Sequence, residues 1–217
     1  MAGSAQPRPY NRRKVHLFHY HLVTSSLREV EERYLAKLGF SLVARHGRIG
    51  EEPVSYEPGT SWQELDRIGF RLRLTELQRG AVNVVVQPGH WAVPRVDHIG
   101  VALEEHEFRE VLARASLLGR RVQEHGGRRT FVATPAGYRL EVHPPREWLE
   151  ELLGKSSDFR LAELRLRADS PPAKAQALAE LLGLDEEAGT VTVGESVVTF
   201  VDDGPEGRPV LDGERFA

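Results

Sequence analysis

The feature that most constrains how this chain of 217 residues can fold is a repeated order of strand and helix patterns. In the first copy, an apolar run predicts a strand, and Ser25 or Ser26 then begins an amphipathic helix that ends at Gly39. Three more strands are expected after this helix, with a Gly- and Pro-rich loop ahead of the last two. The five elements fall at residues 15–22, 25–38, 40–43, 70–77 and 81–86.

The same order returns at once in a second copy, and a shorter third copy follows, in which Pro171 and Pro172 open the helix. The second copy has its elements at residues 96–103, 105–118, 121–124, 130–133 and 138–143, and the third at 159–167, 170–183, 190–193 and 196–201. Repetition of one unit is a strong fold signal, because each copy supports the same reading. We therefore predict an α+β protein of repeated βαβββ units. Its expected parts are a flexible tail at 1–14, units at 15–92 and 95–147, a degenerate unit at 158–205, and a second tail at 206–217.

Composition removes several classes of function. The chain has no cysteine, so disulfides, thiol nucleophiles and iron–sulfur clusters are excluded, and any metal would be held by histidine, carboxylate or water. A formal net charge of -3 gives no general attraction for nucleic acid or for an anionic membrane. No apolar run approaches the roughly 20 residues that cross a bilayer. We expect a cytoplasmic protein whose partner is a small molecule, with no nucleic-acid or membrane partner.

Three segments of the sequence resemble those of a known superfamily. They are His-Tyr-His-Leu-Val at residues 19–23, followed by Tyr34 and a Leu-Gly-Phe at 38–40; Val-Asp-His-Ile-Gly-Val-Ala-Leu at 96–103; and Thr-Pro-Ala-Gly-Tyr-Arg-Leu-Glu-Val at 134–142. Through these segments the chain resembles the vicinal-oxygen-chelate superfamily, which includes glyoxalases, bleomycin-resistance proteins and ring-cleaving dioxygenases. The resemblance extends from residue 15 to about residue 202 and is weakest in the third copy.

In that superfamily, paired units curl their strands around a cavity, and the metal ligands are a His or Gln on a first strand and a Glu on a last strand. The resemblance therefore implies a metal site at His19, His98 and Glu141. The last strand of the first copy offers no Glu, because the equivalent position falls at Asn83 or at one of the two residues after it. This departure weakens the likeness to the four-ligand site of glyoxalases. It favours the ring-cleaving dioxygenases, which use two His and one Glu.

The alternation of side chains along a strand supports the same site. His19 and His21 share one face of the first strand, and His98 and Gly100 share one face of the strand at 96–103. Large apolar residues fill the opposite faces of these strands, and those faces must pack against the helices. The faces that carry the histidines are therefore left to line a cavity. The same reasoning turns Glu141 toward that cavity. Two imidazoles and one carboxylate form a facial triad that leaves open positions on a metal.

Other residues are candidates for supporting roles. His21 could replace His19 as a ligand, or it could orient that ring. The candidate general bases are His21, Tyr138 and His143. The candidate substrate contacts are Arg71, Arg73, Asn83 and Arg139, although the first two could face water and Arg139 could pair with Glu141.

These features favour an enzyme that uses a divalent metal to chelate vicinal oxygens of its substrate, with a ring-cleaving or related dioxygenase as the leading type. Iron(II) is favoured, whereas Mn²⁺, Zn²⁺, Ni²⁺ or Co²⁺ could occupy the same ligands. An isomerase, epimerase or lyase that works through a metal-stabilised enolate is the nearest alternative, and a metal-free drug-binding protein is the second. Because such units usually join two at a time, a third unit predicts a homodimer.

Overall fold

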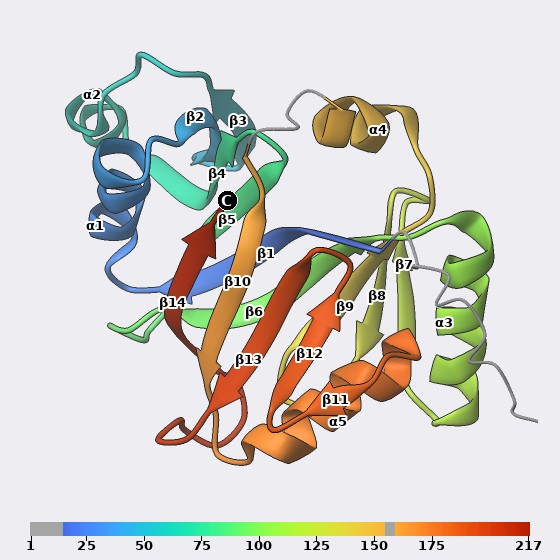
Figure 1. The fold of residues 1–217 in the computed structure, drawn as a ribbon. Coiled ribbons are helices and arrows are strands. Elements are labelled where there is room, and N and C mark those ends of the chain that lie inside the picture. Colours follow the sequence, from blue (N-terminus) through green and yellow to red (C-terminus); the bar gives the residue numbers. More distant parts are fainter. Residues whose placement is uncertain (1–14, 155–158) are drawn as a thin grey trace, which may run out of the picture.

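One mixed sheet with few helices organises the molecule in this computed structural model, which describes residues 15–154 and 159–217 (Figure 1). Its strands run in the spatial order β11-β12-β13-β10-β14-β6-β1-β5-β4-β2-β3, with β9, β8 and β7 branching from β6. The predicted α+β class is confirmed. In the part of the chain that the structure describes, no helix has the length and apolar character needed to cross a membrane.

The first stretch of chain contains more structure than its sequence suggested. Its elements are β1 (His16–Thr24), α1 (Leu27–Glu32), the π-helical turn η1 (Arg33–Lys37), β2 (Ser41–Ile49), β3 (Glu52–Tyr56), α2 (Trp62–Arg67), β4 (Phe70–Arg79) and β5 (Val82–Pro88). The stretch predicted to be a loop holds both β3 and α2. A turn at Gly50 folds β3 back onto β2, and a capping box of Ser61 and Glu64 begins α2. The spacing of Ser61 and Glu64 was a readable signal for this helix.

The second stretch supplies the strand beside β1. Its elements are β6 (Arg95–Ala102), α3 (Glu105–Leu117), β7 (Val122–His125), β8 (Arg129–Ala133), β9 (Arg139–His143) and α4 (Glu147–Gly154). β6 pairs antiparallel with β1 on one side and parallel with β9 on the other, while β5 lies parallel to β1 on its far side. Four neighbouring strands, β5-β1-β6-β9, therefore carry every residue expected to form the metal site.

The third stretch corrects the prediction of a tail at residues 206–217. Its elements are β10 (Leu161–Arg167), α5 (Pro171–Leu182), β11 (Glu186–Glu187), β12 (Thr190–Val193), β13 (Ser196–Val201) and β14 (Val210–Phe216). β14 pairs antiparallel with β10 along its length and touches β6 through one bridge, Val210 to Arg95. A strand forms here because it satisfies the backbone groups along one edge of β10. The tail predicted at 1–14 lies outside the described residues.

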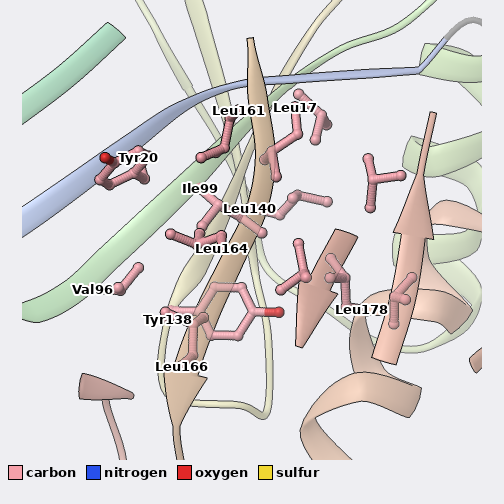
Figure 2. Packing of buried hydrophobic residues seen from close by; sticks show 14 of the residues in the cluster. Leu17, Tyr20, Val96, Ile99, Tyr138, Leu140, Leu161, Leu164, Leu166 and Leu178 are labelled. Carbon is pink, nitrogen blue, oxygen red and sulfur yellow. The ribbon is translucent and has the colours of Figure 1, made fainter. Parts of the chain in front are cut away.

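The core lies on the sheet face opposite the histidines. Tyr20, Ile99 and Leu140 come from β1, β6 and β9 and are fully buried (Figure 2). They pack with Leu164 and Leu166 of β10 in one continuous apolar cluster. This packing presses the apolar face of the first two stretches against the third, which leaves the polar face of β1, β6 and β9 to form a site.

Candidate metal centre

Three predicted ligand atoms meet in one buried place. The Nε2 atoms of His19 and His98 lie 3.0 Å apart, and the Nε2 atom of His98 lies 2.9 Å from Oε2 of Glu141. The distance from the Nε2 atom of His19 to the same oxygen is 3.7 Å. Ligand atoms about 2.1 Å from a common metal, at right angles to each other, lie about 3.0 Å apart. The spacing therefore suits three ligands on one face of a metal ion.

Strand register and one glycine produce this approach. Gly100 lies opposite His19 across the β1–β6 pair and opposite Glu141 across the β6–β9 pair. A Cβ atom at Gly100 would lie 2.8 Å from the Cβ of His19, closer than side chains come in folded proteins. The missing side chain thus leaves room for the imidazole and the carboxylate to converge above it.

Asn83 of β5 fixes the ring of His19. The Oδ1 atom of Asn83 lies 2.7 Å from the Nδ1 atom of His19, while its Nδ2 atom donates to oxygens of Glu76 and Gln78 at 2.8 and 3.1 Å. Because a carboxylate only accepts hydrogen bonds, the amide nitrogen must face Glu76 and the amide oxygen must face the histidine. His19 therefore donates through Nδ1, and its Nε2 atom carries a lone pair.

Asp97 fixes the ring of His98 in the same way. The Oδ2 atom of Asp97 lies 2.8 Å from the Nδ1 atom of His98. Burial by itself raises the pKa of Asp97, but hydrogen bonds from His98 and Arg139 outweigh it and hold the pKa well below its usual range. The carboxylate is thus ionised and accepts from Nδ1 of His98, so the Nε2 atom of this ring is directed toward Glu141 and His19.

The Nδ1 atoms of both imidazoles are therefore engaged outside the cluster, so both Nε2 atoms are directed toward each other and toward the carboxylate of Glu141. A divalent cation between them could bind all three atoms. Burial lowers the pKa of His19 to about 4, and the opposing effect of Glu141 does not restore it, so this ring is neutral at pH 7. Neutral imidazole and ionised carboxylate are the forms that bind metal. The residues present fit a divalent metal ion.

Two further histidines border this cluster. The Nε2 atom of His143 donates to Oε1 of Glu141 at 2.9 Å, so His143 holds the carboxylate from behind. His21 lies across from His98 with a ring-centroid distance of 4.7 Å, and it shares with His19 and His98 a group of ligand atoms within 4.8 Å of one another. Among the described residues, none accepts from or donates to the Nε2 atom of His21. His19 makes the contact with Glu141, whereas His21 reaches the cluster only beside His98.

The structure separates some of the other predicted residues from the site. Tyr138 is buried in the apolar core on the opposite face of the sheet, stacked on Phe200, so its assignment as a general base is wrong (Figure 2). The strand alternation that points Glu141 to the site points Tyr138 away from it. Arg71 is exposed and donates to the carbonyl of Gly50 at 2.6 Å, so it belongs to the β2–β3 turn rather than to a substrate contact.

Arg139 takes a different role from the predicted one, and Asn83 has a structural role in addition to the predicted one. Arg139 forms an ion pair with Asp97 and lies over the ring of Phe131, with its guanidinium carbon 4.6 Å from the ring centroid. Asn83 orients His19 as described above. Of the predicted substrate contacts, Arg73 and Asn83 line open cavities beside the cluster.

Two adjoining cavities of about 280 and 340 Å³ open onto the cluster and share His19, Glu76 and Arg129. Phe18 and Trp148 form an apolar wall of the smaller one, and their rings meet edge to face. The sequence reasoning missed these lining residues. Phe18 reaches the site because it is an extra residue in the pairing of β1 with β6. Such an extra residue turns its side chain out of the normal alternation, here to the same side of the sheet as His19.

Comparison with known proteins places the fold. No family model and no curated protein sequence matches the chain. Among solved structures, a 4-hydroxymandelate synthase variant from Streptomyces coelicolor matches 94% of this chain and 71% of its own length, with 14% identity and a TM-score of 0.61. The Mn(II)-bound glyoxalase from Novosphingobium aromaticivorans matches 92% and 64%, with 10% identity and a TM-score of 0.57.

A halotolerant catechol dioxygenase matches 87% of this chain and 66% of its own length, with 14% identity and a TM-score of 0.54. The chain thus spans about two thirds of the length of the glyoxalase and of the catechol dioxygenase. At these identities the likeness is one of fold. The predicted resemblance is confirmed at that level: the chain has the vicinal-oxygen-chelate fold that catechol dioxygenases and glyoxalases share.

Proposed function

We propose that this chain is a divalent-metal-dependent vicinal-oxygen-chelate enzyme, with His19, His98 and Glu141 as the metal ligands. The observation that carries the proposal is the convergence of three buried ligand atoms, with the Nδ1 atoms of both imidazoles held by Asn83 and Asp97 so that both Nε2 atoms are directed to the site. Within this class, a ring-cleaving or related dioxygenase that favours iron(II) is the leading type. Two histidines and one carboxylate are the ligand set of non-haem iron(II) oxygenases.

When bound, a divalent metal would supply Lewis-acid stabilisation of substrate oxyanions, and iron(II) would add chemistry with oxygen. The chain supplies the rest. Asn83 and Asp97 hold the two imidazoles with Nε2 directed to the site, and His143 holds Glu141.

The cavities beside the cluster suit a small substrate. Their volumes lie at the small end of ligand sites, which fits a single ring or a short dicarbonyl compound. Phe18 and Trp148 offer an apolar wall, and the guanidinium groups of Arg73 and Arg129 offer charge for substrate oxygens on the open side. The Nε atom of Arg129 lies 3.5 Å from Oε1 of Glu141, so this arginine borders the substrate side of the ligands.

A metal-stabilised enolate reaction is the second candidate, because the Mn(II)-bound glyoxalase matches the fold as well as the catechol dioxygenase does. A metal-free binding protein of the bleomycin-resistance type is less consistent with the site. It would have no use for two imidazoles and a carboxylate held within 3.7 Å of one another in a buried place. A homodimer stays a prediction, which sizing chromatography with light scattering would test.

The decisive test is metal content, measured by plasma mass spectrometry on untagged protein, for the wild type and for His98→Ala and Glu141→Ala. We expect about one iron or manganese per chain, lost in both variants and kept in Glu163→Ala, a matched carboxylate on β10 outside the cluster. Oxygen uptake with a panel of catechols would then separate a dioxygenase from an enolate enzyme. Wild-type protein that holds no metal and takes up none from added iron(II), manganese or zinc would contradict the proposal.

A further inference from the structure

Asp97, next to the cluster, has both of its carboxylate oxygens held by hydrogen bonds or ion pairs. It is 4% exposed, and three cationic or donor groups converge on its carboxylate. The ring of His98 contacts Oδ2 at 2.8 Å, Arg139 binds the same oxygen, and the Nη2 atom of Arg208 binds Oδ1 at 2.6 Å. Arg139 belongs to β9, whereas Arg208 lies just before β14. Two distant parts of the chain therefore meet on one carboxylate.

Asp97 can serve His98 because the β1–β6 register slips beside it. His21 pairs with His98 and Leu22 pairs with Val96, so Asp97 is an extra residue between them. An extra residue of this kind rotates its side chain out of the normal alternation. Neighbouring residues on a regular strand would face opposite sides, whereas here the carboxylate reaches the imidazole next to it.

The backbone around Arg208 is attached to the beginning of β6. The amide of Val96 donates to the carbonyl of Pro209 at 2.9 Å, and the amide of Leu211 donates to the carbonyl of Pro94 at 3.0 Å. The guanidinium of Arg95 adds a hydrogen bond of 3.3 Å to the carbonyl of Arg208. These three hydrogen bonds hold the backbone around Arg208 against the beginning of β6, the strand that carries Asp97.

The same segment also rests on the turn that leads into β9. A Cβ atom at Gly137 would overlap the carbonyl of Gly207, so the two backbones touch directly. The buried ammonium group of Lys174 bridges them, donating to the carbonyls of Ala136 and Gly207 at 3.0 and 3.1 Å. The segment thus connects the strand that carries His98 with the turn before the strand that carries Glu141.

We propose that Arg208 is a positioning residue for the metal centre, acting through Asp97 on the imidazole of His98. The inference rests on the proposed function, because it assigns the segment before β14 a role toward the same metal. Arg139 holds Oδ2 from β9, and Arg208 holds Oδ1, so the carboxylate keeps one orientation and the Nε2 atom of His98 keeps its direction. The third part of the chain, which has no cavity-facing histidine of its own among its described residues, thereby supports the site in the first two.

The test is titration of the metal-free full chain with Co(II), followed by visible absorption, which reports both affinity and coordination geometry. The variants are Arg208→Gln, Arg208→Lys and Asp97→Asn, and the control is Arg165→Gln, which also breaks an arginine–aspartate pair, with Asp212 at 2.9 Å. We expect Co(II) affinity to fall about 10- to 100-fold in Asp97→Asn, since loss of a partner of a ligating histidine has that effect. Arg208→Gln should lose about 10-fold with an altered spectrum, while Arg208→Lys and Arg165→Gln should stay close to the wild type.

The outcomes separate the inference from the function on which it rests. Wild-type affinity and spectrum in Arg208→Gln would overturn the positioning role and leave the metal site intact. A wild-type chain that binds no Co(II) would overturn both. Should Arg208→Gln fail to fold, as judged by circular dichroism, Asp97→Asn decides the matter: a normal Co(II) affinity and spectrum in Asp97→Asn would contradict the inference.

Discussion

The strand pairs β1–β6 and β10–β14 are built alike, and they differ in what they carry. Both are antiparallel, and both registers slip twice at matching places. The extra residues are Phe18 and Asp97 in the first pair, and Ala162 and Asp212 in the second. The pattern of pairing is therefore common to the two regions, and any difference in chemistry must come from side chains and neighbouring strands.

Position by position, the second pair has lost the metal site. Glu163 stands where the first pair has His19, and Gly213 stands where it has His98. Arg215 stands where the first pair has Gly100, and its Nε atom lies 3.4 Å from the carboxylate of Glu163.

The remaining polar groups of the second pair neutralise one another. Arg165 and Arg167 both pair with Asp212, at 2.9 and 3.1 Å. These partners and that of Glu163 come from β14, a strand whose residues we had predicted to be a tail.

The neighbouring strand matters as much as the pair itself. β9 lies beside β6 and delivers Glu141 opposite Gly100, whereas the strand beside β14 is β6 itself, through a single bridge. A metal centre in this fold thus needs a small residue at the crossing point and a third strand with a carboxylate. The β1–β6 pair supplies the small residue, Gly100, and only the neighbouring strand β9 supplies the carboxylate.

The largest effect is expected from replacing Gly100 of β6 with arginine, the residue that occupies the matching place in β14. Gly100→Arg should abolish metal binding and lower the free energy of unfolding by about 3 kcal/mol, because any side chain there overlaps His19 in a packed, buried place. Metal content and urea unfolding would measure both effects. The reciprocal Arg215→Gly should cost less than about 1 kcal/mol, since it removes an exposed ion pair. A Gly100→Arg protein that keeps its metal would refute the role given to the glycine.

A smaller effect is expected from removing the group that orients His19. Asn83 lies opposite His19, and Val197 lies opposite Glu163 at the matching place. Asn83→Val should lower Co(II) affinity about 10-fold while the protein stays folded, because the Nδ1 atom loses its shorter acceptor at 2.7 Å and keeps only the main-chain carbonyl of residue 83 at 3.2 Å. Val197→Asn, the reverse change in the second pair, should leave affinity unaltered. Equal affinities in the two variants would count against a defined tautomer at His19.

A still smaller effect is expected in the core that joins the two regions. The hydroxyl of Tyr138 is buried without a hydrogen-bond partner among the described residues, and its ring stacks on Phe200. Tyr138→Phe should therefore raise the free energy of unfolding by up to about 1 kcal/mol and leave metal affinity unchanged. A marked loss of turnover in this variant, with metal content intact, would restore Tyr138 as a general base.

The smallest effect is expected at the counterpart of His19. Glu163→Gln should change the free energy of unfolding by less than about 0.5 kcal/mol, because its contacts with Thr199 and Arg215 are long, at 3.4 Å each. Thermal unfolding and Co(II) titration should both match the wild type. Reduced Co(II) uptake would show that the second pair takes part in metal binding and would break the comparison drawn above.

Much of the candidate site was predictable from the sequence because it depends on local periodicity. Alternation along strands put His19, His98 and Glu141 on the face opposite the apolar core, and the repeated strand and helix order indicated the α+β class. These are short-range properties, so they can be read without knowing which strands pair.

What only the tertiary structure decided depends on pairing between distant segments. The register slips at Phe18 and Asp97 rotate side chains out of the expected alternation, and no local pattern announces them, because a slip is a property of two strands together. β14 was missed for a similar reason. Polar residues of its sequence, such as Asp212 and Glu214, resemble a solvated tail until β10 satisfies its backbone and Arg33 and Arg165 pair with its carboxylates. The sequence by itself determined the donors and the faces; long-range pairing determined which donors meet, because only the folded sheet brings β1, β6, β9 and the segment before β14 together.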